Sequence, residues 1–445
     1  MPRKPRSCCA NRFAQPYINP TATSPVPRQS SHLHRYLDRH AEPEAIRAAQ
    51  GVTGSYRQVL VVPCFDEPAQ LLDSLLPSDV RDLLLVLVIN TPDNAADDAR
   101  QRTRALLEQL GCKGDSREIT HDAARNVGLL VIDRVSCPIP RRQGVGLARK
   151  IGSDCAAALW QYGRVADSWI YSTDADVQLP SEYFEVAMPS RGATVFPFRH
   201  HADSAELQHK ADLYELHMRY YKSRLEWAGS PYAFHTLGST LAVHPEDYAM
   251  VRGYPRRNAG EDFYLLNKLC KVAPIHSLEG PVLSIRARYS SRTPFGTGAS
   301  LTKISDASAY PSYAAESFQL LRRVLVAFAN AGNGHDLNLD QQARQILDEL
   351  GFGTFFTQAQ AQYTKTPNLH KAIADWFDGF RTLRFIHECR RHFPDAPLRN
   401  TLGQLFPAWA GQSAHAQAEH FLAIDRARRK VTSVMRPRSQ KRQDS

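Results

Sequence analysis

Short apolar runs alternate with segments of helical spacing through the first half of this 445-residue chain. The apolar runs are Val59–Val62, Leu83–Ile89, Gly128–Asp133 and Trp169–Ser172, and the segments with helical spacing are Glu67–Leu76, Asp98–Leu110 and Leu147–Trp160. Runs of this length suit strands that are buried on both faces, as in parallel sheets covered by helices. The alternation therefore predicts βαβ units and an α/β, Rossmann-like fold with a mostly parallel sheet.

The pattern changes near Pro311, after which only helical spacing is found. The predicted helices there are Ser312–Ala329, Leu339–Leu350 and Leu369–Phe393. We predict a basic N-terminal segment (1–50) that is disordered apart from a helical turn near Ala41–Ala49, a catalytic α/β domain (51–305), a helical C-terminal domain (306–425) and a disordered basic tail (426–445).

The net charge of +10 is concentrated at the two ends of the chain. By direct count residues 1–50 carry about +5 and residues 426–445 about +7, so the part between them is slightly negative. This distribution argues against a specific nucleic-acid partner, and it allows a weak peripheral contact of the tails with a membrane surface. The eight cysteines are scattered, which indicates reduced thiols, and no apolar run is long enough to span a bilayer. We expect a cytoplasmic protein.

Two carboxylates directly follow the fourth apolar run. Asp174 and Asp176 lie one residue apart after Trp169–Ser172. In open α/β sheets, ligands bind beyond the carboxyl ends of the strands, and paired oxygen donors there suit a divalent cation that bridges a diphosphate. An Asp at a strand end also commonly caps the next turn, so the pair alone leaves both interpretations open.

Two further segments carry residues suited to the same ligand. Pro63 ends the first apolar run, and Asp66 and Glu67 follow it as acceptors for a base or ribose. The segment Arg141–Lys150 combines two glycines, four cations and a helix start, which suits a diphosphate. A Pro-terminated turn and a solvated cationic helix start are the simpler interpretations of these two segments.

A third segment, Gly260-Glu261-Asp262, opens a helix whose leucines face the core. An acidic residue at a helix start is commonly a cap. Asp262 is also well placed to act as a general base that deprotonates an acceptor hydroxyl.

Taken in this order, the motifs resemble those of GT-A fold, family 2-like glycosyltransferases. The residues that carry the resemblance are Pro63 to Glu67; Gly144, Ala148, Arg149, Lys150 and Gly152; Asp174 and Asp176; Gly238, Ser239 and Ala242; and Gly260, Glu261 and Asp262. The resemblance covers residues 57–290, a little over half of the chain.

The resemblance implies roles for these residues. Asp176 would bind Mn²⁺ or Mg²⁺ directly, with Asp174 touching the metal, the ribose or the sugar. Asp262, beside Glu261, would be the base of an inverting transfer. The implied donor-binding residues are Pro63, Glu67, Gly144, Arg149, Lys150, Asp174, Gly238 and Ser239.

The chain departs from the family pattern at two places. The second strand of the family usually ends in an Asp that contacts the base, whereas here Asn90 or Asp93 must substitute. The family often has a late histidine as a third metal ligand, and arginines stand in the comparable stretch. His276 is the candidate for that ligand, although a structural role is the simpler interpretation of this histidine.

The sequence thus predicts a metal-dependent glycosyltransferase of hexosyl type that uses a nucleotide-diphosphate sugar. The acceptor stays open: a saccharide, a lipid-linked sugar or a small molecule. The alternatives are a sugar-nucleotide nucleotidyltransferase and a non-catalytic binding protein on a transferase fold. The acidic pair after the first strand disfavours the nucleotidyltransferase, which would usually carry a glycine-rich, basic loop there.

Overall fold

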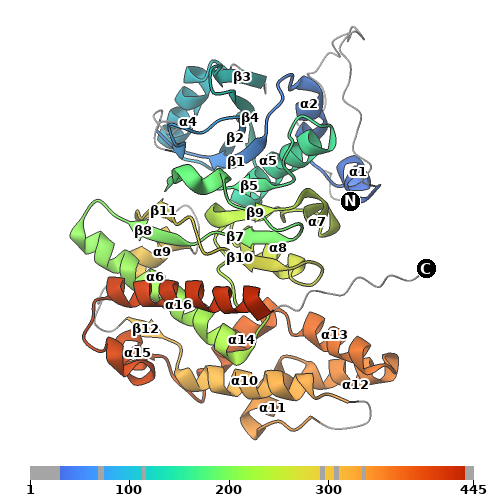
Figure 1. The fold of residues 1–445 in the computed structure, drawn as a ribbon, viewed down its shortest axis with the longest axis vertical. Coiled ribbons are helices and arrows are strands. Elements are labelled where there is room, and N and C mark those ends of the chain that lie inside the picture. Colours follow the sequence, from blue (N-terminus) through green and yellow to red (C-terminus); the bar gives the residue numbers. More distant parts are fainter. Residues whose placement is uncertain are drawn as a thin grey trace. The chain divides into compact units, whose positions relative to one another are not determined.

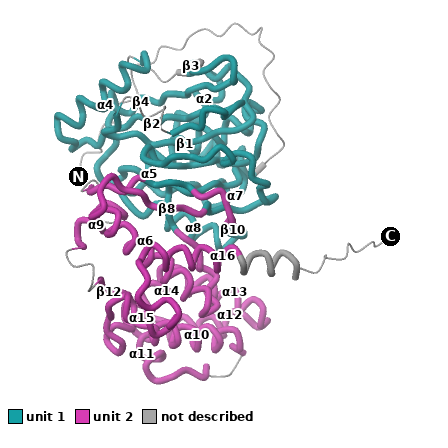
Figure 2. The backbone as a smooth tube through the Cα atoms, turned by 60° about the vertical axis from the view of Figure 1, so that its left-hand side comes forward, with its two compact units in different colours: residues 1–196, 236–276, 283–285 teal, residues 197–235, 277–282, 286–445 magenta. Residues whose placement is uncertain are grey.

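The computed structural model describes residues 31–68, 75–112, 117–290, 296–304, 310–332 and 337–435. The chain divides into two compact units, coloured separately in Figure 2. Unit 1 comprises residues 1–196, 236–276 and 283–285, and unit 2 comprises residues 197–235, 277–282 and 286–445. The expected division near residue 305 therefore differs from the structure, because residues 197–235 belong with the helices of unit 2.

A mixed eight-stranded sheet forms the centre of unit 1 (Figure 1). In spatial order its strands are β10 (Ile275–Ser277), β7 (Ala193–Val195), β9 (Leu241–Val243), β5 (Ile170–Ser172), β1 (Gln58–Cys64), β2 (Leu83–Pro92), β4 (Val127–Ile139) and β3 (Arg117–Asp122). β5, β1, β2 and β4 are parallel, whereas the pairs β3–β4, β5–β9 and β7–β9 are antiparallel. The prediction of an α/β fold with a mostly parallel sheet is confirmed, and the arrangement is compatible with a Rossmann-like fold.

The parallel strands are buried because their sequences are continuous apolar runs. Every side chain from Leu83 to Ile89 is at most 1% exposed. The covering helices and short elements of unit 1 are α4 (Asp97–Gln109), α5 (Gly144–Gln161), η1 (Ser181–Phe184), η2 (Gly238–Thr240), α7 (Pro245–Met250) and α8 (Glu261–Leu269), and β6 (Val177–Gln178) pairs with β11 (Leu283–Arg286). α5 packs on β1 and β2, and a Cβ atom at Gly152 would lie 2.4 Å from Cγ1 of Val61. Glycine at this position therefore lets the helix lie close to the sheet.

Most of the predicted strands and helices of unit 1 match observed elements. The predicted helix Glu67–Leu76 lies largely outside the described residues. The sequence pattern did not predict β3, because its sequence holds a single apolar residue, Ile119, and so lacks the apolar run by which the other strands were identified.

Two helices occupy part of the segment expected to be disordered. α1 (Ser31–Arg39) and α2 (Glu44–Gly51) bury Leu33, Ala45 and Ala48. α2 agrees with the helical turn expected near Ala41–Ala49, whereas the expected disorder is wrong at α1. Polar residues interrupt the apolar pattern of this segment, which is why the sequence alone suggested disorder. Residues 1–30 lie outside the described part of the chain.

A buried polar network joins α1 to α5 and α7. The Lys150 ammonium donates to the Asp154 carboxylate at 2.9 Å and to the Tyr36 hydroxyl at 2.6 Å. Asp154 also accepts from the hydroxyls of Tyr36 at 2.5 Å and Tyr248 at 2.9 Å, and from the backbone N–H of Glu42 at 2.8 Å. A buried ion pair is stable only when its polar atoms are satisfied, so this segment is part of the fold rather than a tail.

Unit 2 is built mainly of helices around an apolar core. Its elements are β8 (Phe198–His201), α6 (Ala205–Ala228), α9 (Thr297–Lys303), β12 (Pro311–Ser312), α10 (Ala315–Ala329), α11 (Gln341–Glu349), α12 (Phe352–Gln362), α13 (Thr366–Trp376), α14 (Gly379–Cys389), β13 (Ala396–Pro397), α15 (Leu398–Leu405), η3 (Pro407–Trp409) and α16 (Ala414–Met435). Tyr220, Phe318, Leu369 and Phe385 are fully buried in this core. The prediction that only helices follow Pro311 therefore holds except for the short strand pair β12–β13.

Two predicted boundaries in unit 2 are wrong. The single helix expected over Leu369–Phe393 is divided into α13 and α14, because the Asp378 carboxylate accepts the backbone N–H of Arg381 at 3.2 Å and starts a new helix. The basic tail expected from residue 426 instead continues α16 as far as Met435.

Neither unit contains, within its described residues, a helix long and apolar enough to cross a membrane.

Five of the described cysteines are free, namely Cys64, Cys112, Cys155, Cys270 and Cys389, whereas Cys137 is disulfide-bonded. The expectation of reduced thiols therefore does not hold at Cys137.

The buried network predicts a measurable effect of one hydroxyl on stability. Tyr36→Phe removes a hydrogen bond to Asp154 and one from Lys150 while the ring is kept, so the free energy of unfolding should fall by about 1–3 kcal/mol in urea titrations. Tyr289→Phe is the control, because that ring is 50% exposed, and it should change stability by less than about 0.5 kcal/mol. Equal effects of the two substitutions would contradict the role given to the network.

Candidate functional site

The carboxyl end of β5 presents the first acidic residues of the candidate site. The Thr173 backbone N–H donates to the carbonyl of Val61 on β1 at 3.1 Å, and the Thr173 hydroxyl donates to the carbonyl of Ser239 at 2.9 Å. These bonds fix the chain just before Asp174, whose side chain is 39% exposed. Asp176 lies two residues further on, partly exposed, in the turn between β5 and β6.

One arginine of α5 binds this strand end to the start of α8. The Arg149 side chain is only 3% exposed. Its Nη2 lies 2.5 Å from Oδ1 of Asp174, and its Nε lies 2.9 Å from Oε1 of Glu261. Its Nη1 donates to the hydroxyl oxygen of Ser172 at 2.9 Å. The structure thus brings together Arg149, Asp174 and Glu261, three of the residues predicted from separate motifs.

Gly238 joins Asp262 to the same arrangement. The backbone N–H of Gly238 donates to Oδ2 of Asp262 at 2.8 Å, and that of Phe263 donates to Oδ1 at 2.7 Å. A Cβ atom at Gly238 would lie 2.6 Å from Nη2 of Arg149, so the backbone passes directly against the guanidinium. Because the clash would involve a buried, doubly paired arginine, no residue but glycine suits this position.

Burial and charge change the proton affinity of the two acids on α8. Burial, followed by the charge of Glu261, raises the pKa of Asp262 to about 7 from a usual value of 3.8. Burial also raises the pKa of Glu261, although the Arg149 charge opposes this shift. A carboxyl group with a pKa near 7 can accept or release a proton at neutral pH.

The glycines of the Arg141–Lys150 segment have a packing role. A Cβ atom at Gly144 would lie 2.7 Å from Cα of Asn258, and the backbone N–H of Gly146 donates to the carbonyl of Arg257 at 2.8 Å. The backbone approach that was predicted to favour a diphosphate is therefore used by the loop that leads into α8. This packing helps to place Glu261 and Asp262 next to α5.

The four cations of that segment separate into two pairs. Arg141 and Arg142 are exposed, whereas Arg149 and Lys150 are buried. Lys150 belongs to the network with Tyr36 and Asp154, so the structure does not bring it into contact with the acids of the candidate site. Adjacent residues on a helix point about 100° apart, which accounts for the separation of Arg149 from Lys150.

The other predicted donor-binding residues lie at the carboxyl ends of β1 and β2. Pro63 is buried within β1 opposite Val88, and Glu67 is 7% exposed in the segment that follows. Asp93 follows β2, and its carboxylate accepts the backbone N–H of Arg141 at 2.9 Å. Asp93 therefore helps to hold this turn, whereas its contact with a base stays a prediction.

The metal prediction rests on two carboxylates. No group of three or more His, Cys, Asp or Glu side chains is arranged to hold a metal ion within the described ranges. His276 lies in β10, at the edge of the sheet and beyond β9 and β7 from β5. Mg²⁺ is usually held by one or two carboxylates together with substrate phosphates, so the partly exposed pair Asp174 and Asp176 suits such an ion. The set Asp174, Asp176 and His276 stays a prediction.

Ser172 and Thr173 are site residues that the sequence analysis missed. Ser172 ends the strand that was predicted and Thr173 directly follows it, but neither has a side chain that signals its role. The contact from Arg149 Nη1 to Ser172 and the bond from Thr173 to Ser239 depend on pairing between distant segments. Their position directly before the acidic pair was the one signal available.

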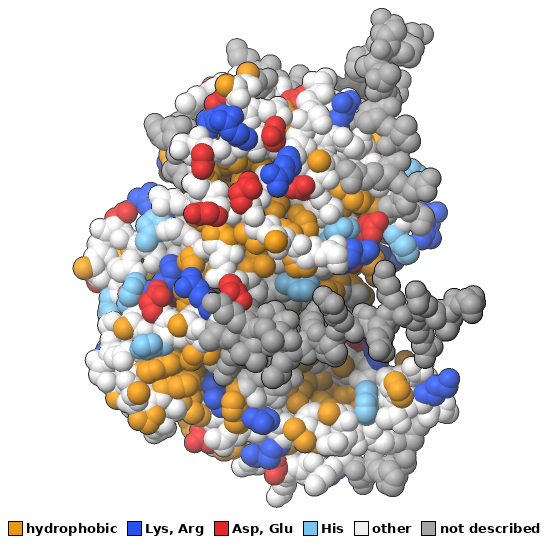
Figure 3. All heavy atoms as spheres, viewed as in Figure 1, with side chains coloured by type: hydrophobic (Ala, Val, Ile, Leu, Met, Phe, Trp, Pro, Cys, Tyr) orange, Lys and Arg blue, Asp and Glu red, His pale blue; other side chains and the backbone are white. Residues whose placement is uncertain are grey.

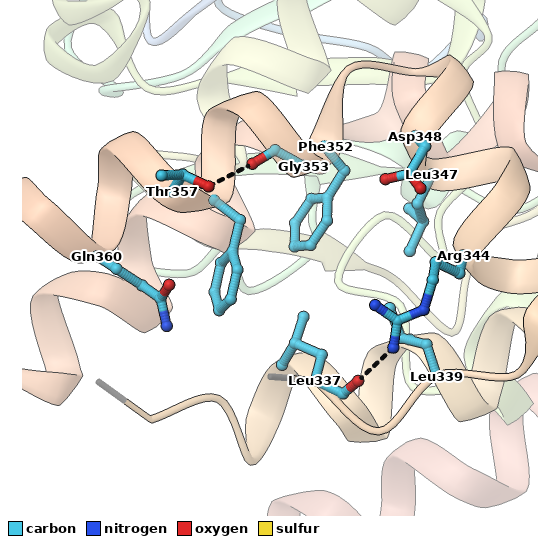
Figure 4. Close-up of a pocket in the computed structure, with 10 residues that line it drawn as sticks. Leu337, Leu339, Arg344, Leu347, Asp348, Phe352, Gly353, Thr357 and Gln360 are labelled. Carbon is cyan, nitrogen blue, oxygen red and sulfur yellow. Dashed lines mark hydrogen bonds between the residues drawn. The ribbon is translucent and has the colours of Figure 1, made fainter. Parts of the chain in front are cut away.

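A separate cavity of about 150 Å³ lies in unit 2 (Figure 4). It is lined by Leu337, Leu339, Arg344, Leu347, Asp348, Phe352, Gly353, Phe356, Thr357 and Gln360. Arg344 donates to the carbonyl of Leu337 at 3.2 Å, and Thr357 donates to that of Gly353 at 3.1 Å. Its lining combines leucine and phenylalanine side chains with polar ones and contains the single carboxylate Asp348, so it lacks the paired acids found in unit 1.

The surface charges bear on the expected partners. On the face drawn in Figure 3, Lys and Arg side chains lie among Asp and Glu side chains, and no broad basic patch forms among the residues coloured there. Nucleic-acid sites usually concentrate positive charge on one face.

No protein-family model and no curated protein sequence matches the chain.

The raised pKa of Asp262 predicts a pH-dependent stability. Between pH 4 and 7 the folded chain keeps a proton that the unfolded chain releases, so rising pH destabilises the folded state over this range. Asp262→Asn removes that titration. Relative to the parent, this variant should gain on the order of 1–2 kcal/mol in free energy of unfolding between pH 5 and pH 8.

Urea titrations at the two pH values measure this difference. Asp375→Asn in unit 2, whose carboxylate is 40% exposed and pairs with Lys371, serves as the control. A difference between parent and Asp262→Asn that does not vary with pH would contradict the raised pKa.

Proposed function

We propose that the chain is a GT-A fold glycosyltransferase that moves a hexose from a nucleotide-diphosphate sugar to an acceptor hydroxyl, with inversion. The observation that carries this proposal is the contact of Arg149 with both Asp174 and Glu261, at 2.5 and 2.9 Å. Through it, the acidic strand end expected on the donor side and the acidic helix start expected on the acceptor side belong to one site. A ligand bound beyond β5 would therefore lie beside both.

The donor side consists of Asp174 and Asp176 with the segments after β1 and β2. Asp176 would hold Mn²⁺ or Mg²⁺, and Asp174, which keeps exposed surface beside Arg149, would contact the metal, the ribose or the sugar. When bound, the ion neutralises the charge of the departing nucleoside diphosphate. Glu67 and Asp93 are the candidates for contact with the nucleoside, and Gly238 and Ser239 would lie near the transferred sugar.

The acceptor side consists of Asp262 with Glu261. A pKa of about 7 suits a base that removes a proton from a hydroxyl near neutral pH. The backbone N–H groups of Gly238 and Phe263 hold the Asp262 carboxylate in one orientation. A fixed base is more effective than a mobile one because its geometry needs no adjustment during the reaction.

A non-catalytic binding protein would need the donor side and not the base. The raised pKa of Asp262 favours catalysis, because a carboxyl group that exchanges a proton near neutral pH suits a reaction and is not needed for simple binding. A nucleotidyltransferase would share the metal site, and it would have no need of a base for an acceptor hydroxyl.

The role of Asp262 as base is tested by a change of one atom. Asp262→Asn should leave the affinity for the donor nearly unchanged and lower turnover by on the order of 10²–10⁴, because the amide cannot take up the proton. Calorimetry and initial rates separate the two quantities. Asp375→Asn should match the parent in both, and full turnover by Asp262→Asn would refute the assignment.

The metal assignment predicts a different pattern for Asp176→Ala. This variant should lose the Mn²⁺ dependence of donor binding together with most of the binding itself, because the ion links the protein to the diphosphate. Calorimetric titration of the donor with and without Mn²⁺ measures the effect. Donor binding by the parent that needs no divalent ion would contradict the proposed metal site.

A further inference from the structure

Arg149 has the geometry of a structural bridge within the site rather than of a ligand contact. Three nitrogens of its guanidinium each have a partner: Nη2 bonds Asp174, Nη1 bonds Ser172 and Nε bonds Glu261. A planar group held at three of its nitrogens has a single orientation. With only 3% of the side chain exposed, little of the guanidinium is left to meet a bound diphosphate.

The bridge extends to the proposed base through Gly238. The backbone of Gly238 lies against the guanidinium, since a Cβ atom there would be 2.6 Å from Nη2. The N–H of the same residue donates to Oδ2 of Asp262 at 2.8 Å. The position of Arg149 therefore limits where Gly238 lies, and Gly238 in turn orients the Asp262 carboxylate.

We propose that Arg149 is a positioning residue that fixes Asp262 relative to Asp174 without itself binding the donor. This inference rests on the proposed function, and it replaces the diphosphate contact that the sequence motif implied for Arg149. Through one side chain, the end of β5 and the start of α8 keep a constant separation. A base and a metal-side carboxylate must keep such a separation if a hydroxyl and a sugar carbon are to meet between them.

Lysine cannot replace this arginine in the proposed role. Its ammonium is a single centre on a flexible stem, whereas the guanidinium presents donors in a rigid fork that reaches two carboxylates at once. In Arg149→Lys the charge is kept, and one of the two acids loses its partner. The substitution therefore removes the geometry of the bridge while it retains a cation in the site.

The first test of the bridge needs no enzymatic activity. Asp174→Asn, Glu261→Gln and the double variant are compared by urea unfolding. Because both carboxylates share Arg149, their effects should be non-additive by at least tenfold in the unfolding equilibrium constant, or about 1.4 kcal/mol. Additivity to within about twofold would overturn the bridge.

The second test separates positioning from donor binding. In Arg149→Lys, kcat should fall at least 100-fold while KM for the nucleotide sugar stays within about threefold. A large rise in KM with kcat unchanged would overturn the proposal and indicate a donor contact. Arg134→Lys is the matched control, since Arg134 is a largely buried arginine that pairs with Glu44 at 2.6 Å, and both constants should stay within about twofold.

The two tests also distinguish this inference from the proposed function. A parent chain without transferase activity would refute the proposed function, and the unfolding comparison would still decide whether Arg149 joins the two carboxylates. If the parent is active and the two substitutions have additive effects on unfolding, the proposed function stands and the bridge is refuted.

Discussion

The buried guanidinium of Arg149 is the interaction on which the candidate site depends. It faces Asp174 from the end of β5 and Glu261 from the start of α8, two acids that would repel one another without it. An arginine is always charged, so this positive centre persists at every physiological pH. Removal of one partner from such a buried group commonly costs several kcal/mol, because the remaining charges lose their compensation.

The architecture of unit 1 explains how one side chain can reach both acids. α5 follows β4, so its first turns lie at the carboxyl edge of the parallel strands, where β5 also ends. Gly152 lets α5 lie close to β1. Gly144 and Gly146 let the loop before α8 pack on the start of α5. Close packing of three elements by small residues thus produces a dry position for a charged group, and every contact of the site lies within unit 1.

Much of the fold was predictable because burial on both faces leaves a strong sequence pattern. The apolar runs located the parallel strands, and the acidic pair after Trp169–Ser172 indicated the edge of the sheet at which the candidate site lies. The sequence predicted Arg149 and Asp262 as members of one site, and the structure joins them through Glu261 and Gly238.

Most of the errors come from contacts that are distant in the sequence. The sequence motif does not distinguish Lys150 from its neighbour Arg149. Only the contacts of Lys150 with Tyr36 and Asp154 show its structural role. α1 buries Leu33, Tyr36 and Leu37 along one face, but this apolar stripe is short and stands among charged and polar residues, so it was overlooked in the sequence. The cap at Asp378 is a local feature, and it was hidden by apolar residues that continue the helical spacing through it.

Sugar transfer is the central claim, and the identity of the released nucleotide tests it most directly. The parent chain is incubated with Mn²⁺ and UDP-, GDP- or dTDP-hexoses, and the nucleotide products are separated by chromatography. At least one donor should yield the nucleoside diphosphate, by transfer or by slow hydrolysis, and chelation of the metal should stop its release. Binding of every donor without turnover, or release of pyrophosphate in a parallel incubation with a nucleoside triphosphate and a sugar phosphate, would contradict sugar transfer.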